Sequence, residues 1–259
     1  MNTYAVLLPA RTPRSAFGKL LQSETKIAWR VPIGLVFGVA FPVLLLVIFG
    51  CIPAMKKPDA SLGGLTYFAS YFPILIGFAL AALCLISLPI HLARDREQGI
   101  LRRMSTTPVP PAWMLAAQVI INLALAVLAL GTMVLAATTV FGLAAPTQAG
   151  GFTLALVLTA AAMFAIGLWI SAIARTASGA SIIGQLLLYP LLFSSGLYFA
   201  QQLMPPVLRQ ISELLPLGAG VHAMQLSMQG TFPSATSLLV LAAWAAVFSF
   251  LAVRFFRWE

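Results

Sequence analysis

Long apolar runs, separated by short clusters of proline, glycine or charge, dominate this chain. A hydrocarbon core about 30 Å thick is crossed by about 20 apolar residues in an α-helix, and six of the runs are long enough. The pattern therefore predicts an all-α, polytopic membrane protein with six transmembrane helices in one domain, 1–259. The predicted spans are 31–52, 65–91, 113–143, 152–173, 179–199 and 235–253.

Composition agrees with a bilayer setting. Hydrophobic residues make up 61% of the chain and charged residues 8%, which leaves too little polar surface to cover a soluble fold. The first run is too long and too far along the chain to be a cleaved secretory signal. We therefore expect it to remain in the mature protein as the first span.

Positive charge is distributed unevenly between the two sets of loops. If both termini are cytoplasmic, twelve of the 15 Lys and Arg residues lie on that side, and only Lys56, Lys57 and Arg209 lie outside. The positive-inside rule therefore predicts cytoplasmic termini. The same bias explains the net charge of +9 without a nucleic-acid partner.

Side chains for catalysis or ion coupling are scarce in the predicted spans. None of the six has a charged interior, so the sequence predicts neither a proton relay nor a sodium site. Cys51, Cys84, His91 and His222 lack the spacing of a disulfide framework or a metal site. A phosphate-binding loop is missing as well, so we expect any nucleotide to bind a separate polypeptide.

The densest charge lies between the second and third spans, where 94–103 holds six of the chain's 21 charged residues. This stretch predicts a short helix with Ile100 and Leu101 on its apolar side and Arg102 and Arg103 elsewhere, stopped by the prolines that follow. Such a helix suits a groove in a cytoplasmic partner. The alternative is a solvated loop whose arginines only set the topology.

A second amphipathic segment, 11–30, precedes the first span. Its apolar positions share one helical face and Lys19, Lys26 and Arg30 lie opposite, which predicts a helix on the inner membrane surface. Glu24 interrupts the apolar face. We expect Glu24 either to meet a basic group on a partner or on the charged loop, or to pair locally.

Three motifs occur in order along the chain. After the basic amphipathic segment come Glu97-Gln98-Gly99-Ile100-Leu101 with Thr107-Pro108-Val109-Pro110, and then Ser195-Gly196-Leu197-Tyr198-Phe199, Met204-Pro205-Pro206 and Leu215-Pro216-Leu217. Together they resemble the type-2 permease subunit of bacterial ATP-binding-cassette (ABC) exporters, over nearly the whole chain. The chain departs from that pattern at 199–201, where related chains often carry proline.

The resemblance implies a role for each region. It makes the cytoplasmic loop 94–111 the element that couples to the ATPase, with Glu97 and Gly99 matching its motif. It also implies that the second and fifth spans line the path between paired permeases. The candidate path residues are Phe72, Tyr189, Phe193, Leu197 and Tyr198. For the aromatic cluster around Phe72, a lipid-facing belt is the alternative.

Residues 200–233 are expected to hold an external helix between the fifth and sixth spans. Its apolar positions at helical spacing include Val207, Leu208 and Ile211. Arg209 and Glu213 lie one turn apart on its other face. The resemblance makes this helix a re-entrant or interfacial cap, and a helix resting on lipid is the alternative.

The sequence and the resemblance together predict the permease of an ATP-driven exporter of amphiphilic drugs, antibiotics or lipids in the bacterial inner membrane. The expected partners are two ATPase subunits, which would bind ATP and Mg, and a second permease copy or a sister permease. We expect no cofactor, metal or catalytic residue in this chain. A non-transporting anchor for an ATPase is the alternative. A hydrolase built on Ser181 and His222 is disfavoured because the two residues are predicted near opposite membrane faces.

The charge count generates a labelling test. In a chain whose Cys51 and Cys84 are replaced, a cysteine at Ser105 should react with an impermeant thiol reagent only from the cytoplasm. A cysteine at Gln148 should react only from outside. Intact cells and inverted vesicles are compared by the mass shift of the labelled protein. Reversed labelling would contradict the predicted orientation.

Overall fold

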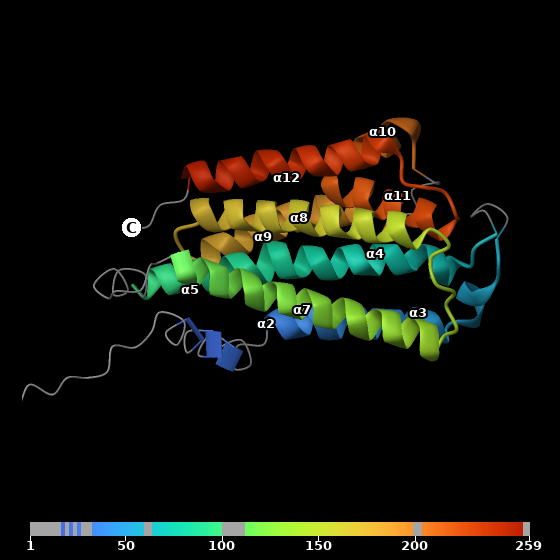
Figure 1. Ribbon diagram of the computed structural model, residues 1–259, viewed down its shortest axis with the longest axis horizontal. Helices are drawn as coiled ribbons and strands as arrows, with labels where there is room; N and C mark the ends of the chain where they lie inside the picture. The colour runs from blue at the N-terminus through green and yellow to red at the C-terminus, as the bar shows by residue number, and fades with distance from the viewer. Residues whose placement is uncertain are drawn as a thin grey trace, which may run out of the picture.

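The computed structural model describes residues 17–18, 21–22, 25–26, 33–59, 64–99, 112–198 and 204–255. Every regular element within these ranges is a helix, so the all-α prediction is confirmed. Most of the helices run side by side along the long axis (Figure 1). In chain order they are α2 (Ile33–Leu35), η1 (Val36–Ala40), α3 (Phe41–Cys51), η2 (Pro53–Lys56), α4 (Tyr67–Ala82), η4 (Leu83–Ser87), α5 (Leu88–Glu97), α7 (Ala112–Thr139), α8 (Ala149–Ile173), α9 (Ala177–Ser194), α10 (Pro206–Leu214), α11 (Pro216–Met228) and α12 (Ala235–Phe255).

The six predicted spans correspond to five long apolar helices and one shorter one. The long helices are Tyr67–Glu97, Leu115–Thr139, Ala149–Ile173, Ala177–Ser194 and Ala235–Phe255. The shorter helix, Val36–Cys51, continues α2 without a break. The chain is therefore a multi-pass membrane protein.

The second span is longer than the sequence pattern suggested. The segments α4, η4 and α5 form one continuous helix through Glu97, so 94–97 is its last turn and does not start a separate short helix. Asp95 in that turn is only 7% exposed. The predicted span 65–91 itself has no charged residue, but the helix extends beyond it and buries Asp95, whose side-chain partner is described below.

Two π-helical turns accommodate one proline in the first span and one in the second. Pro42 follows η1, and Pro89 follows η4. A proline has no N–H to donate, and its ring collides with the carbonyl four residues earlier in a regular helix. A π turn shifts that carbonyl to a different position, so the helix continues past each proline.

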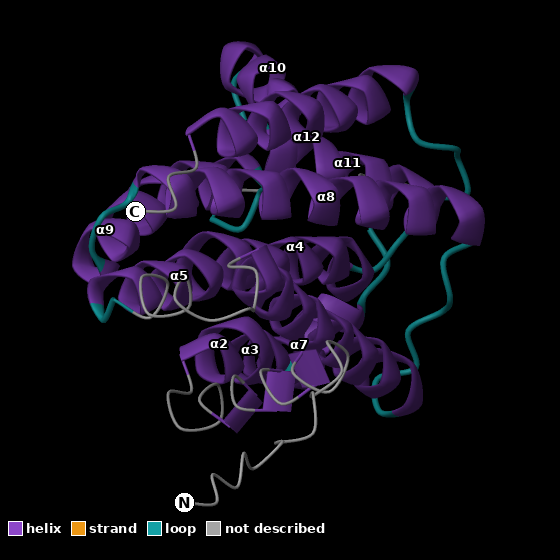
Figure 2. Cartoon of the chain, turned by 60° about the vertical axis from the view of Figure 1, so that its left-hand side comes forward, coloured by secondary structure: helices purple, strands orange, loops and turns teal. Residues whose placement is uncertain are grey.

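The α4–α5 helix lies at the centre of the bundle. It is placed between α8, α11 and α12 on one side and α2, α3 and α7 on the other (Figure 2). Nearly all of its apolar stretch is buried. A helix that is hydrophobic on every side is expected to occupy such a central position.

Glycines let two helices approach this central helix closely. A Cβ atom at Gly167 of α8 would overlap the carbonyl oxygen of Cys84, and one at Gly184 of α9 would overlap that of Leu85. Both carbonyls belong to η4. Small residues at helix contacts permit this backbone approach in membrane proteins.

Two helices occupy the connection between α9 and α12. The predicted external helix is observed as α10, which is followed directly by α11. With 13 residues α11 spans only about 20 Å, yet most of it is buried against α4, α8 and α12. The helix α11 is therefore buried in the bundle but too short to cross the bilayer.

The close approach at η4 generates a stability test. Replacing Gly184 with Ala should destabilise the protein by about 1 to 3 kcal/mol, since the added methyl group meets a backbone oxygen that cannot rotate away. Gly131→Ala on α7 is the control, because a Cβ there meets no atom within 4 Å. The thermal unfolding midpoint in detergent measures both variants. Equal losses of stability would contradict this account of the packing.

Candidate functional site

The α5 helix ends at Glu97, and Gln98 and Gly99 form the turn that follows it. Gly99 has a φ of +65°, a left-handed conformation that glycine adopts without strain. Its N–H donates to the Arg96 carbonyl at 3.0 Å, and the Gln98 N–H donates to the Arg94 carbonyl at 2.9 Å. These bonds satisfy carbonyls that the last helical turn would otherwise leave open. The structure therefore explains why a glycine stands at this position of the motif: it ends the helix just before residues 100–111.

Glu97 is exposed beside this turn, in a position open to a partner. The other candidate coupling residues lie outside the described residues. They are Glu24, Ile100, Leu101, Arg102 and Arg103. Their roles, and that of Glu97, stay predictions.

Described parts of the amino-terminal segment lie near the start of α7. The Phe17 ring packs edge-to-face on Trp113, with ring centroids 5.5 Å apart. The Thr25 hydroxyl donates to the Leu21 carbonyl at 2.8 Å, which is a helical spacing. The segment therefore lies at the same end of the bundle as Gly99, which we call the charged end (Figure 1).

Two charged residues missed by the sequence analysis form tertiary contacts at the charged end. The buried Asp95 carboxylate accepts a hydrogen bond from the Gln118 side-chain amide of α7 at 3.4 Å. Arg96 Nη1 donates to the Ser171 carbonyl at 3.1 Å and to the Ala174 carbonyl at 2.8 Å, at the end of α8. A signal was available, since Asp95 is placed one turn after His91 on the buried stripe of the helix.

A groove of about 640 Å³ opens between the first, second and fifth spans. Six of the twelve described residues that line it are aromatic, and among these twelve only Gln185 has a side-chain amide. The rings of Phe41 and Phe78 lie 5.7 Å apart, centroid to centroid. The lining is Phe37, Phe41, Leu45, Phe49, Phe78, Ile86, Gln185, Leu188, Tyr189, Leu192, Leu197 and Tyr198.

Three of the five candidate path residues line this groove. Tyr189, Leu197 and Tyr198 are among its walls, whereas Phe193 lies on α9 outside the lining. Phe72 is 4% exposed and belongs to the hydrophobic core. The structure therefore brings together the fifth-span candidates and leaves Phe72 apart from them.

The first span supplies groove residues that the sequence analysis did not select. Phe37, Phe41, Leu45 and Phe49 recur every four residues. Residues at this spacing lie along one side of a helix. The stripe was therefore readable from the sequence, but its facing partner on α9 was not.

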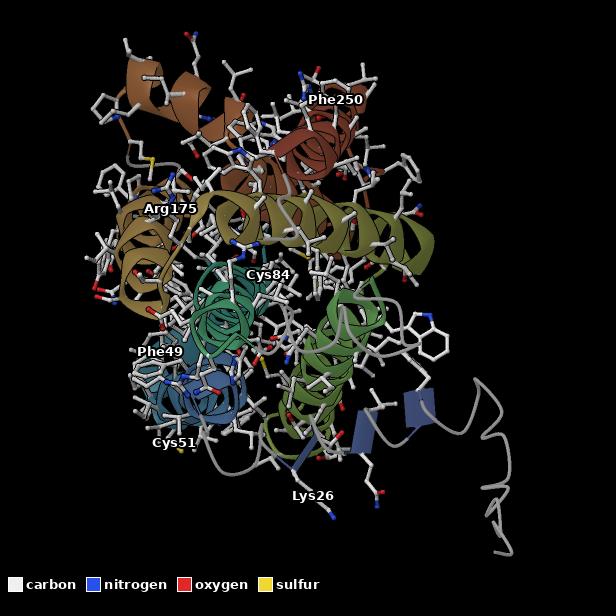
Figure 3. All side chains as sticks on the ribbon, turned by 90° about the vertical axis from the view of Figure 1, so that its left-hand side faces the viewer. Lys26, Phe49, Cys51, Cys84, Arg175 and Phe250 are labelled. Atoms are coloured by element: carbon white, nitrogen blue, oxygen red, sulfur yellow. The ribbon has the colours of Figure 1, made fainter. Side chains whose placement is uncertain are left out.

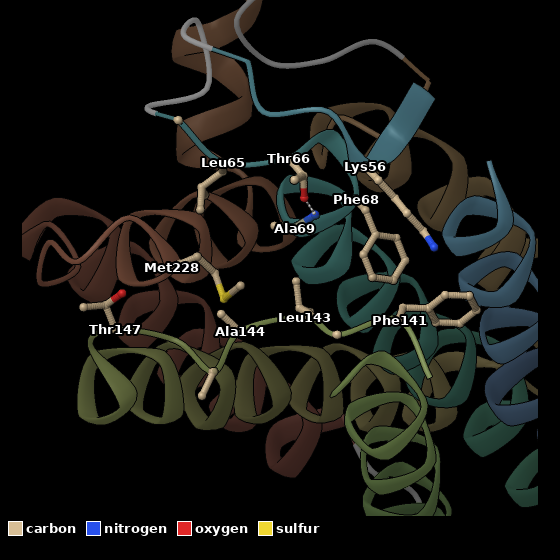
Figure 4. Close-up of a pocket in the computed structure, with 13 residues that line it drawn as sticks. Lys56, Leu65, Thr66, Phe68, Ala69, Phe141, Leu143, Ala144, Thr147 and Met228 are labelled. Atoms are coloured by element: carbon tan, nitrogen blue, oxygen red, sulfur yellow. Dashed lines mark hydrogen bonds between the residues drawn. The ribbon is translucent and has the colours of Figure 1, made fainter. Parts of the chain in front are cut away.

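A second pocket, of about 390 Å³, is shown in Figure 4. The elements that line it lie at the end of the bundle opposite the charged end (Figure 1). Its walls come from the start of α4, the 141–147 connection and Met228 of α11. The Lys56 ammonium lies 5.5 Å from the centre of the Phe141 ring, a favourable cation–π arrangement. Thr66 caps α4 by accepting from the Ala69 N–H at 3.1 Å. None of the described residues that line this pocket is an acid, a cysteine or a histidine.

The α10 helix exposes an apolar face made of Val207, Leu208 and Ile211. On its other face Arg209 and Glu213 form the ion pair expected from their spacing, at 3.3 Å. Two bonds hold α10 to the spans: the Ser212 hydroxyl donates to the Ser194 carbonyl of α9, and the Trp244 indole of α12 donates to the Leu214 carbonyl. Whether the apolar face caps a path or rests on lipid stays a prediction.

The hydrolase alternative gains no support. The Ser181 hydroxyl, near the first turn of α9, accepts a hydrogen bond from Gln185 at 3.0 Å, and His222 lies within α11. Within the described part of the chain, no cluster of three or more His, Cys, Asp or Glu could hold a metal ion.

A family comparison decides the class. The sequence model of the family described as ABC-2 type transporter matches residues 15–228, well over half of the chain. The chain belongs to the ABC-2 type transporter family. No curated protein matched the chain.

Membership makes this chain the membrane-spanning permease of an ABC transporter, a family whose permeases pair with an ABC ATPase. The resemblance inferred from the motifs is therefore confirmed. The matched range of this ABC-2 permease runs from the amino-terminal segment to the end of α11. It includes both the charged loop and every helix that lines the groove.

Proposed function

We propose that this ABC-2 permease exports amphiphilic molecules along the aromatic groove, driven by ATP and Mg bound to two separate ATPase subunits. The single observation that carries the proposal is that one helix reaches both regions. The helix that ends at Glu97 also supplies Phe78 and Ile86 to the groove wall. A displacement of the charged end is thereby transmitted to the groove through a stiff element.

The chemistry of the groove supports an amphiphilic cargo. Its walls are mainly aromatic and aliphatic, with the Gln185 amide and the Tyr189 and Tyr198 hydroxyls as polar groups. Pockets with large apolar walls and a few polar groups suit drug-like molecules and lipids. A polyanion or a bare ion would find no compensating charge on these side chains.

Exposure of the groove supports a paired permease. Phe37, Tyr189 and Tyr198 are all exposed in a single chain. A second copy or a sister permease facing this side would enclose the path. In this arrangement the charged end and both termini are cytoplasmic, in a bacterial inner membrane, as the positive-inside bias favours.

The coupling assignment is tested at Glu97 and Gly99. Glu97→Lys reverses an exposed charge, and Gly99→Leu places a side chain at a positive φ, which costs about 1 to 2 kcal/mol. Both variants should insert normally but bind the ATPase less well or transport less per ATP hydrolysed. Gln98→Ser, at an exposed neighbouring position, is the control.

Co-purification with the ATPase and transport in proteoliposomes measure these effects. Wild-type behaviour of both variants would remove the coupling role of this turn. ATPase binding by the wild-type chain without any transport would favour the anchor function instead.

The cargo path is tested by removing its aromatic walls. Tyr189→Ala and Phe41→Ala each remove a ring of about 150 to 250 Å² of contact surface, so they should change which hydrophobic compounds the cell resists while basal ATP hydrolysis continues. Phe250→Ala is the control, since Phe250 lies on α12, on the opposite side of the bundle from Phe49 (Figure 3). An unchanged resistance profile in both groove variants would contradict the proposed path.

A further inference from the structure

We propose that Arg96 and Asp95 form a clamp that fastens the base of the coupling loop to two neighbouring helices. Arg96 reaches α8, and Asp95 reaches α7. The clamp rests on the proposed function, because it gives these residues a positioning role in coupling. Its structural half is testable without the ATPase.

Arg96 caps the end of α8. The carbonyls of Ser171 and Ala174 belong to the last turn and the C-cap of that helix, where backbone oxygens lack partners within the helix. One nitrogen of the guanidinium donates to both. The positive charge also lies at the negative end of the helix dipole, which adds to the attraction.

Asp95 makes the second attachment. Its carboxylate is buried and accepts from Gln118, which is itself 4% exposed. Asn122, one turn further along α7, donates to the Gln118 carbonyl at 2.9 Å. A hydrogen bond to a buried carboxylate is stronger than one between neutral groups, which favours a persistent link between α5 and α7.

Both attachments lie in the helical turn just before the coupling loop. The helix that precedes the loop is bonded through Asp95 to α7, the helix that follows it. The same turn is bonded through Arg96 to α8. A push on the loop is therefore expected to move three helices together, instead of bending the chain at Gly99.

The α8 attachment extends the reach of that movement. α8 packs most extensively on α12 and also packs on α11. Thr159 of α8 lies directly against Gly220 of α11, so a side chain at Gly220 would not fit. Arg96 thus connects the loop to the α8, α11 and α12 group, and Phe78 and Ile86 connect it to the groove.

The transport experiment uses the complete permease with its ATPase in proteoliposomes. Arg96→Met should keep ATPase binding and hydrolysis but lower transport per ATP by about tenfold, because hydrogen bonds from a charged donor are lost. Arg96→Lys should recover most of the wild-type transport per ATP, since an ammonium also donates to carbonyls. Arg94→Met is the matched control: it removes a cation from the same turn, and no side-chain hydrogen bond of Arg94 is seen among the described residues.

The structural experiment uses the permease alone. Spin labels on Gln98→Cys and Ser178→Cys, both at exposed positions, report the distance between the end of α5 and the start of α9, close to the α8 terminus. Cys51 and Cys84 are replaced in every sample. The distribution of distances between the two labels should be narrow in the chain that keeps Arg96 and broad in Arg96→Met. Arg94→Met should stay narrow.

Each outcome has a distinct meaning. A narrow distribution and a normal transport ratio in Arg96→Met would overturn the clamp. If Arg96→Met broadens the distance distribution but the wild-type complex never transports, the clamp is supported and the proposed function is rejected. If Arg96→Met does not insert, Gln118→Met replaces it: transport per ATP should fall while the Gln98–Ser178 distance stays narrow, and an unchanged ratio would overturn the α7 attachment.

Discussion

The need to satisfy every backbone hydrogen bond inside a hydrocarbon layer shapes this permease. The second span meets it with one unbroken helix from Tyr67 to Glu97, and its π turn η4 carries the chain past Pro89. Because this helix is apolar on all sides, it becomes the centre on which the other spans pack. Gly167 and Gly184 then bring α8 and α9 against its backbone at η4.

The proposed function rests on two parts of that central helix. Its middle contributes Phe78 and Ile86 to the aromatic groove shared with the first and fifth spans, and its last turn is followed by the Gly99 cap. In the proposed mechanism, the ATPase moves the charged end and the helix transmits this movement to the groove.

The charged side chains of Asp95 and Arg96 can be buried or half-buried because both form hydrogen bonds. Arg96 and Asp95 occupy adjacent positions but bond to different helices, α8 and α7. Arg96 donates to carbonyls at the end of α8, where the helix itself supplies no partners, and Asp95 accepts from the side-chain amide of Gln118. The residues that make the turn compatible with burial are therefore also the residues that link the helices.

The sequence by itself determined the membrane class, the positions of the spans, the amphipathic α10 with its Arg209–Glu213 pair, and the family, because hydropathy, helical spacing and motifs are local properties. It also identified Gly99, which lies in the turn after α5, and the groove residues Tyr189, Leu197 and Tyr198. Only the tertiary structure decided that Phe72 belongs to the core, that Phe41 faces α9, and that Asp95 and Arg96 bind neighbouring helices. Those facts depend on which faces of distant helices meet, and a pattern within one helix does not specify its partner.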